Sequence, residues 1–111
     1  MTDQGADLER ALAGLRRQYL LEAPERLAEL RAALARAGAG NAEALSQLRL
    51  LLHRLAGSGG SYGFDDVSTR ARAAELLVRD VLERGGPVTD DDVEVLAGRI
   101  AELAEAFRAA R

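Results

Sequence analysis

The sequence has no cysteine, and aromatic residues make up only 4% of its 111 residues. Without cysteine, neither a disulfide framework nor a thiolate metal site can form. The scarcity of aromatic and β-branched residues argues against a β-sheet protein, and the longest apolar runs are far too short to cross a bilayer. Most apolar residues are alanine and leucine, which favour helices. The composition therefore predicts an all-α protein.

Lysine is also missing, so all 15 basic residues are arginine, and 18 acidic residues give a net charge of -3. Nucleic-acid-binding domains usually have a basic surplus, so we expect no nucleic-acid partner. The polar, acidic N-terminus does not resemble a secretion signal, which favours a cytoplasmic location without a membrane partner. A chain of this length, with 48% apolar residues, can bury one core. We therefore expect a single domain over residues 1–111.

Apolar residues recur at helical spacing along the first third of the chain. The series is Leu8, Leu12, Leu15, Tyr19, Ala23, Leu27, Leu30 and Leu34. This continuous stripe predicts one long helix. Pro24 lies within it, and because its ring clashes with the carbonyl four residues earlier, the helix is predicted to kink or restart there. Residues 38–41 end this helix, and Asn41 is expected to cap the next one.

Three further amphipathic segments follow, the first of them beginning just after residue 41. The next is predicted to begin with Asp65 or Asp66 as its cap and to end before residues 85–87, Gly-Gly-Pro. The last begins at Thr89, which resembles a capping box together with Asp92. Four amphipathic segments with short connections predict an antiparallel up-down four-helix bundle.

The only histidine, His53, lies in a glycine-rich part of the second segment. The apolar residues there are spaced as in a helix. Inside a helix, however, each of four glycines would lower the stability by about 1 kcal/mol relative to alanine: Gly57, Gly59, Gly60 and Gly63. At about 100° per residue, His53 shares one outward strip with Gly57 and Gly60. Bare backbone on that strip would let another molecule approach an exposed imidazole. Gly59 and Gly63 fall toward the core face, where small residues would let a neighbouring helix pack closely.

Residues 53–64, HRLAGSGGSYGF, resemble the signature His-x-Leu-Lys-Gly-Ser-x-x-x-x-Gly-Phe/Ala of histidine-containing phosphotransfer (Hpt) domains. The resemblance implies that His53 accepts a phosphoryl group from a receiver aspartate or a kinase and passes it to a response-regulator aspartate. It also implies a phosphocarrier rather than an autonomous enzyme. A response-regulator receiver domain and a sensor histidine kinase are the expected partners of a monomeric chain. We expect no metal or cofactor on this chain, with Mg²⁺ supplied by the receiver.

The resemblance also implies roles for residues around His53. Glu75 corresponds to the acidic residue that orients the histidine in chemotaxis-type domains. The residues expected to form the docking surface are Arg49, Arg54, Ala56, Gly57 and Gly60. Ala56 stands where the signature has lysine, and Arg49, Arg54 or Arg72 could supply the missing positive charge.

Other interpretations remain open from the sequence. The same surface could bind a receiver or another helix without phosphorylation, or the glycines could serve contact between the chains of a dimeric bundle. Glu75 could pair with Arg72 or Arg79 on its own helix, and a lone histidine is often simply exposed. Phosphate labelling of His53 separates the phosphocarrier from the two other functions.

Overall fold

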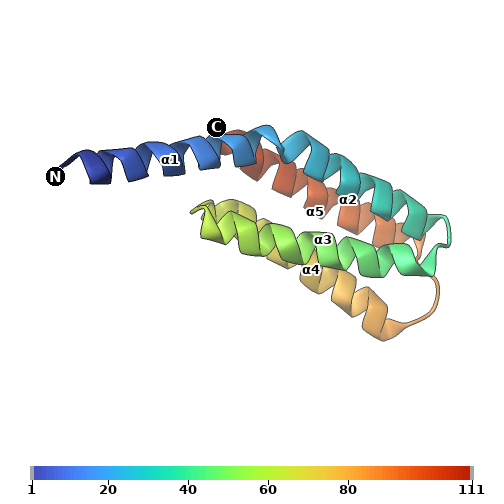
Figure 1. Cartoon of the computed structure of the whole chain (residues 1–111). Coiled ribbons are helices and arrows are strands. Elements are labelled where there is room, and N and C mark those ends of the chain that lie inside the picture. The colour runs from blue at the N-terminus through green and yellow to red at the C-terminus, as the bar shows by residue number, and fades with distance from the viewer. Residues whose placement is uncertain (1, 111) are drawn as a thin grey trace.

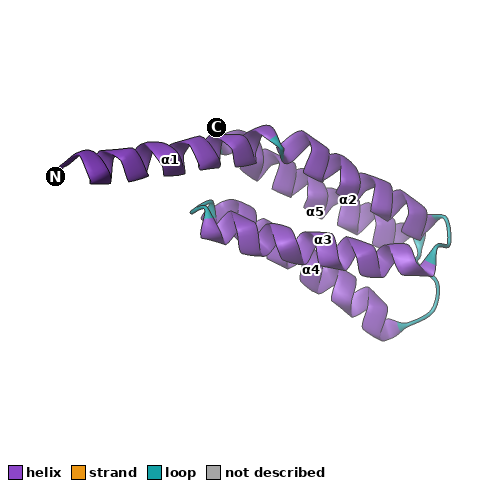
Figure 2. Ribbon diagram, in the orientation of Figure 1, coloured by secondary structure: helices purple, strands orange, loops and turns teal. Residues whose placement is uncertain are grey.

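The computed structural model describes residues 2–110, and within that range it consists of helices, turns and loops without a strand. The helices are α1 (Thr2–Leu21), α2 (Ala23–Gly38), α3 (Ala42–Ser61), α4 (Asp65–Arg84) and α5 (Asp90–Ala109). Helices α2 to α5 form an antiparallel bundle, and α1 continues from α2 beyond its end (Figure 1, Figure 2). The predicted all-α four-helix bundle is confirmed. Across the described residues, no helix is long and apolar enough to span a membrane.

The predicted interruption near Pro24 is also confirmed. Helix α1 ends at Leu21 and α2 begins at Ala23, with Pro24 in its first turn, where a backbone N–H has no intrahelical acceptor to lose. The two parts form one long helix bent by 38°. The apolar stripe read from the sequence runs through this bend, but only its α2 part lies in the core.

The core fills the space between α2, α3, α4 and α5, each of which contacts its two neighbours in the ring. Its largest fully buried side chains are Leu30, Leu48, Leu52, Val67, Val78, Leu96, Ile100, Leu103 and Phe107. An aromatic cluster closes the end where α1 leaves. The Tyr19 ring stacks on Phe64 at 5.7 Å between centroids, and it also contacts the rings of Tyr62 and Phe107. This cluster fixes the base of α1 on the bundle.

Two of the predicted helix caps are present. The Asn41 side chain accepts hydrogen bonds from the backbone N–H groups of Glu43 and Ala44 at the start of α3. Thr89 and Asp92 form the capping box of α5, each side chain accepting from the backbone N–H of the other. Both devices satisfy N–H groups that a helix leaves without partners in its first turn.

The cap predicted at Asp65 or Asp66 is wrong. Phe64 occupies the N-cap position of α4 and provides no side-chain hydrogen bond, while both aspartates lie in the first helical turn. Their negative charges still favour the helix because they stand near its positive end. Because of the tight turn from α3, α4 begins at Asp65 itself, one residue earlier than it would if Asp65 were the cap.

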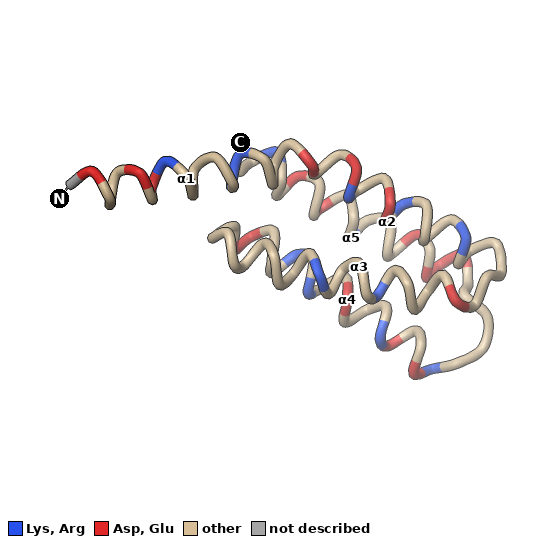
Figure 3. Tube along the Cα trace, in the orientation of Figure 1, with Lys and Arg blue, Asp and Glu red and all other residues tan. Residues whose placement is uncertain are grey.

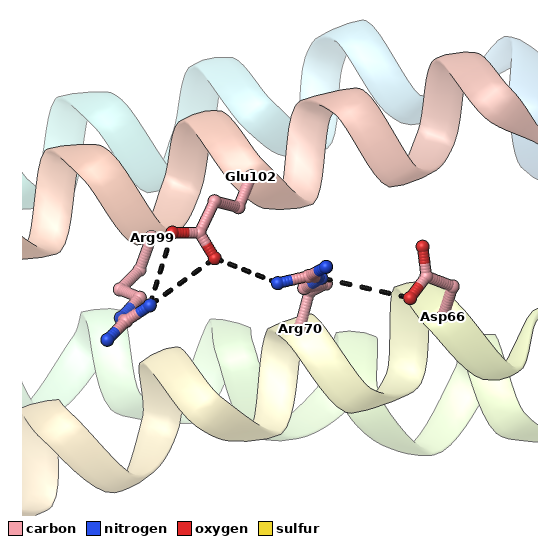
Figure 4. Close-up of polar contacts among 4 residues, drawn as sticks. All are labelled: Asp66, Arg70, Arg99 and Glu102. Atoms are coloured by element: carbon pink, nitrogen blue, oxygen red, sulfur yellow. Dashed lines mark hydrogen bonds and ion pairs between the residues drawn. The ribbon is translucent and has the colours of Figure 1, made fainter.

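An exposed chain of ion pairs joins α4 to α5 (Figure 4). Arg70 Nη1 donates to Glu102 Oε2 at 3.0 Å, and Arg70 Nε lies 3.7 Å from Asp66 Oδ1. Arg99 Nη1 donates to Glu102 Oε1 at 3.1 Å. Because these groups are partly exposed, each pair contributes only about 0.2–1 kcal/mol, and the bundle depends mainly on its apolar core.

Candidate functional site

The site consists of two side chains from adjacent helices. His53 projects from α3 with 64% of its side chain exposed, whereas Glu75 of α4 is buried, with 11% of its side chain exposed. His53 Nδ1 lies 2.9 Å from Glu75 Oε2. A carboxylate can only accept a hydrogen bond, so we assign the proton to Nδ1. This leaves Nε2 as the unprotonated nitrogen of the ring. The exposed imidazole therefore offers a nitrogen nucleophile of fixed orientation.

Glu75 reaches this position from the edge of the apolar face of α4, whose buried residues include Ala71, Ala74 and Val78. Its contact is with His53, 22 residues earlier in the chain, and not with an arginine of its own helix. Arg79 instead lies 3.8 Å from Glu83. The second oxygen of Glu75, Oε1, is buried without a hydrogen-bond partner among the described residues. The carboxylate is thus directed toward the histidine by the fold.

The backbone beside His53 is bare, as the sequence predicts. A Cβ atom added at Gly57, one turn after His53, would meet nothing within 4 Å. Gly60 is exposed too, although a Cβ there would come within 3.3 Å of Ser68 Oγ. Ser68 was not anticipated from the sequence, because a lone serine on α4 has no pattern that relates it to α3.

Ala56 does not belong to the exposed surface, contrary to expectation. It is buried against α4, where Ser68 Oγ donates a hydrogen bond to its carbonyl oxygen at 2.6 Å. The reason is helical geometry, since Ala56 is displaced by about 100° from Gly57 and turns toward the neighbouring helix. The position of the signature lysine therefore lies at the α3–α4 contact.

The two remaining glycines of the motif have different surroundings. Gly59 is buried as predicted, and its missing Cβ would lie 3.0 Å from Val67 Cγ1 and 3.2 Å from the backbone N of Ser68. The prediction for Gly63 is wrong, because it lies beyond the end of α3 in the turn to α4. Its φ of +83° is in the left-handed region that favours glycine. Gly59 allows close helix packing, and Gly63 allows the chain to turn.

The arginines expected near the site are divided between two surfaces. Arg49 and Leu50 line a surface pocket of about 350 Å³ together with His53 and Glu75. Arg54 instead lines a pocket on the side of α1 and α2. Leu50 is exposed; the sequence patterns did not identify it, because a leucine among other leucines gives no sign of exposure. The structure thus brings Arg49 and an apolar contact to the histidine.

Comparison with known proteins agrees with this geometry. The family model described as the Hpt domain matches residues 14–110. The chain belongs to the Hpt domain family. Searches of curated proteins and of solved structures gave no significant match. Hpt domains are phosphocarriers of two-component systems, so the family confirms the type of function that the histidine motif indicates. Residues 2–13, the outer part of α1, lie outside the matched region.

Proposed function

We propose that this Hpt domain carries a phosphoryl group on Nε2 of His53. It receives the group from a receiver aspartate or a sensor histidine kinase and passes it to the aspartate of a response-regulator receiver domain. The observation that carries the proposal is the exposed His53 ring, whose Nδ1 lies 2.9 Å from the buried Glu75 carboxylate. This contact leaves one defined nitrogen available for transfer.

The chemistry follows from that tautomer. When the donor is an aspartyl phosphate, the bond between phosphorus and the aspartate oxygen breaks, and its electron pair stays on the leaving carboxylate. The lone pair of Nε2 forms the new bond to phosphorus. Because Nδ1 keeps its proton, the ring gains a positive charge, which the Glu75 carboxylate offsets while accepting the N–H. Transfer to the next aspartate breaks the P–N bond and returns the neutral ring.

The partner supplies the remaining catalytic groups in this proposal. Phosphoryl transfer depends mainly on positioning and on stabilising charge. A Mg²⁺ ion would be held by the receiver domain, and this chain would bind none itself. Gly57 leaves room for the partner beside the acceptor, Leu50 offers apolar contact, and Arg49 offers a positive charge near the incoming phosphoryl group.

Substitution of the acceptor tests the proposal. The wild-type chain, incubated with a receiver domain carrying a labelled aspartyl phosphate, should gain an acid-labile label, and His53→Gln should gain none. The thermal unfolding midpoint should hardly change because the His53 side chain is largely exposed. Labelling of the glutamine variant would overturn the assignment. Tight receiver binding without labelling of the wild-type chain would instead identify a non-phosphorylated interaction module.

A further inference from the structure

The surface pocket beside His53 extends along α3 toward the start of that helix. Arg49 and Leu50 line it together with His53 and Glu75. Side chains of an α-helix lean toward its N-terminus, so the His53 ring lies over the turn that carries Arg49 and Leu50. Arg49 precedes His53 by four residues, a spacing that places the two Cβ atoms about 5–6 Å apart on one face. The long side chain of Arg49 is therefore within reach of a group attached to the ring.

Arg49 is not neutralised by a carboxylate of its own chain. In Figure 3, basic and acidic positions are mixed along the bundle helices, so local pairing determines which arginine has a charge to offer. The arginines with a carboxylate oxygen within 4.0 Å are Arg10, Arg26, Arg70, Arg79, Arg84, Arg99 and Arg108. Arg49 has no such partner among residues 2–110. Its positive charge remains available in the pocket.

The sequence left two other arginines as sources of positive charge beside the histidine. Arg54 lines a separate pocket, in which the carboxyl groups of Glu22 and Glu29 also lie. Arg72 precedes Glu75 by three residues on α4 but does not line the pocket of His53. The geometry therefore selects Arg49 from the three.

A phosphoryl group on His53 would make the pocket strongly negative without Arg49. A protein-bound phosphoryl group carries a charge of about -1.5 to -2 at neutral pH, and the Glu75 carboxylate adds a further negative charge. The phosphorylated ring, which keeps its Nδ1 proton, offsets only one of these charges. A guanidinium can donate to two phosphoryl oxygens at once and keeps its charge at any physiological pH. Arg49 thus has both the charge and the donors that the group requires.

We propose that Arg49 binds the phosphoryl group attached to His53 and favours its fully ionised form. The inference rests on the proposed function, in which Nε2 of His53 carries the group. Glu75 then orients the ring from below, and Arg49 binds the phosphoryl oxygens from the preceding turn of α3. Gly57 lies one turn away in the other direction, where its bare backbone leaves the approach of the receiver open.

Phosphorus NMR of the phosphorylated chain tests the contact without a partner protein. Phosphoramidate, a small phosphoryl donor, can label His53, which is the only histidine. A nearby positive charge favours the ionised form, so the pKa of the phosphoryl group should be lower in the wild type than in Arg49→Gln by about 0.5 or more. Arg49→Lys keeps the charge and should restore most of this difference.

Arg54→Gln is the matched control, because it removes the same charge from the other side of α3. Its phosphoryl group should titrate like that of the wild type. Identical titrations of the wild type and Arg49→Gln would overturn the proposal. An equal change in Arg54→Gln would also overturn it, because the effect would then be one of net charge and not of contact.

Transfer from a phosphorylated receiver domain measures what the contact contributes to the reaction. Arg49→Gln should accept the group about tenfold more slowly or slower still, because a charge-assisted hydrogen bond is lost. Its thermal unfolding midpoint should hardly change, since Arg49 is exposed. An unchanged rate would overturn the inference and leave the proposed function intact. If the wild-type chain accepts no group from receivers or kinases, the proposed function fails, and the phosphorus titration still decides whether Arg49 binds the phosphoryl group.

Discussion

Two glycines of α3, only two residues apart, lie on opposite faces of the helix and serve opposite purposes. Gly57 faces open space one turn from His53, whereas Gly59 faces α4 with Val67 and the backbone of Ser68 in close contact. One glycine leaves the surface beside His53 open, and the other lets two helices of the same chain approach. Under the proposed function, the glycine-rich motif thus combines a requirement of function with a requirement of folding.

The difference explains how His53 and Glu75 come together. Close packing of α3 on α4 at Gly59 sets the distance between the two helices near the motif. Further along the same pair of helices, Glu75 Oε2 lies 2.9 Å from His53 Nδ1. The packing of the buried face of α3 on α4 therefore sets the position of His53, on the exposed face, relative to Glu75. Substitutions on the two faces should separate these contributions.

The largest expected effect comes from adding the same side chain on each face. Gly59→Val should lower the free energy of unfolding by about 2–3 kcal/mol, because its Cβ and methyl groups would overlap Val67 and the Ser68 backbone. Gly57→Val, the matched control, meets open space and should leave that free energy within about 0.5 kcal/mol of the wild-type value. Urea unfolding of both proteins measures the difference. Equal stabilities would contradict the assignment of the two faces.

A second prediction concerns the carboxylate behind the histidine. Glu75→Gln keeps the shape of the side chain but weakens the acceptor for the Nδ1 proton, so the rate of phosphorylation should fall about tenfold or more. Affinity for the receiver should stay unchanged, since Glu75 is buried beneath the ring. Single-turnover transfer and binding titrations separate the two quantities. A loss of affinity at an unchanged rate would make Glu75 a docking residue instead of an orienting one.

A third prediction concerns the open side of the helix. Gly57→Ala should raise the free energy of unfolding by about 1 kcal/mol, because alanine favours the helix and its methyl group meets no neighbour. The same change should slow phosphotransfer by placing a methyl group beside the acceptor. Thermal unfolding and a transfer assay on one preparation test the expected rise in stability and the expected fall in transfer rate. Undiminished transfer in Gly57→Val as well would show that the bare backbone is not needed by the partner.

The smallest effect is expected far from the histidine, at the start of α5. Hydrogen bonds from Arg84 and from the backbone N–H of Thr89 hold the pKa of Asp92 well below its usual range. The charged form is therefore favoured in the folded state, and its stabilisation is complete above the ordinary aspartate pKa of about 4 and is lost as the pH falls below it.

Asp92→Asn removes this pH-dependent contribution while leaving an oxygen to accept from Thr89. The stability difference between wild type and variant should shrink as the pH falls below about 4, and phosphotransfer at neutral pH should not change. Urea unfolding as a function of pH provides the measurement. A difference that is constant with pH would show that the Arg84 pair does not stabilise the fold through the Asp92 charge.

Local sequence patterns predicted much of this structure. Helical periodicity located the helices, Pro24 marked the bend, and Asn41 and Thr89 marked helix starts, because each of these signals acts within a few residues. The pattern failed where the outcome depends on contacts between helices. Asp65 and Asp66 are acceptable caps in isolation, but the tight turn after Gly63 determines where α4 begins.

The candidate site was predictable only in part. The motif identified His53 and its bare neighbour Gly57, and the family resemblance pointed to Glu75. The burial of Ala56 depends on which side of α3 faces α4, and the exposure of Leu8, Leu12 and Leu15 depends on where the bundle ends. Periodicity shows that residues share a face, but it cannot show whether the same chain covers that face.

The most direct test of the account is NMR spectroscopy of the phosphorylated chain with ¹⁵N-labelled histidine. The account predicts a phosphorus–nitrogen coupling to Nε2 of His53, together with a proton on Nδ1 that is protected from solvent exchange by Glu75. In Glu75→Gln the coupling should remain, and the Nδ1 proton should exchange faster. A phosphoryl group on Nδ1, or on any residue other than His53, would contradict the central claim that the His53–Glu75 contact defines the transferring nitrogen.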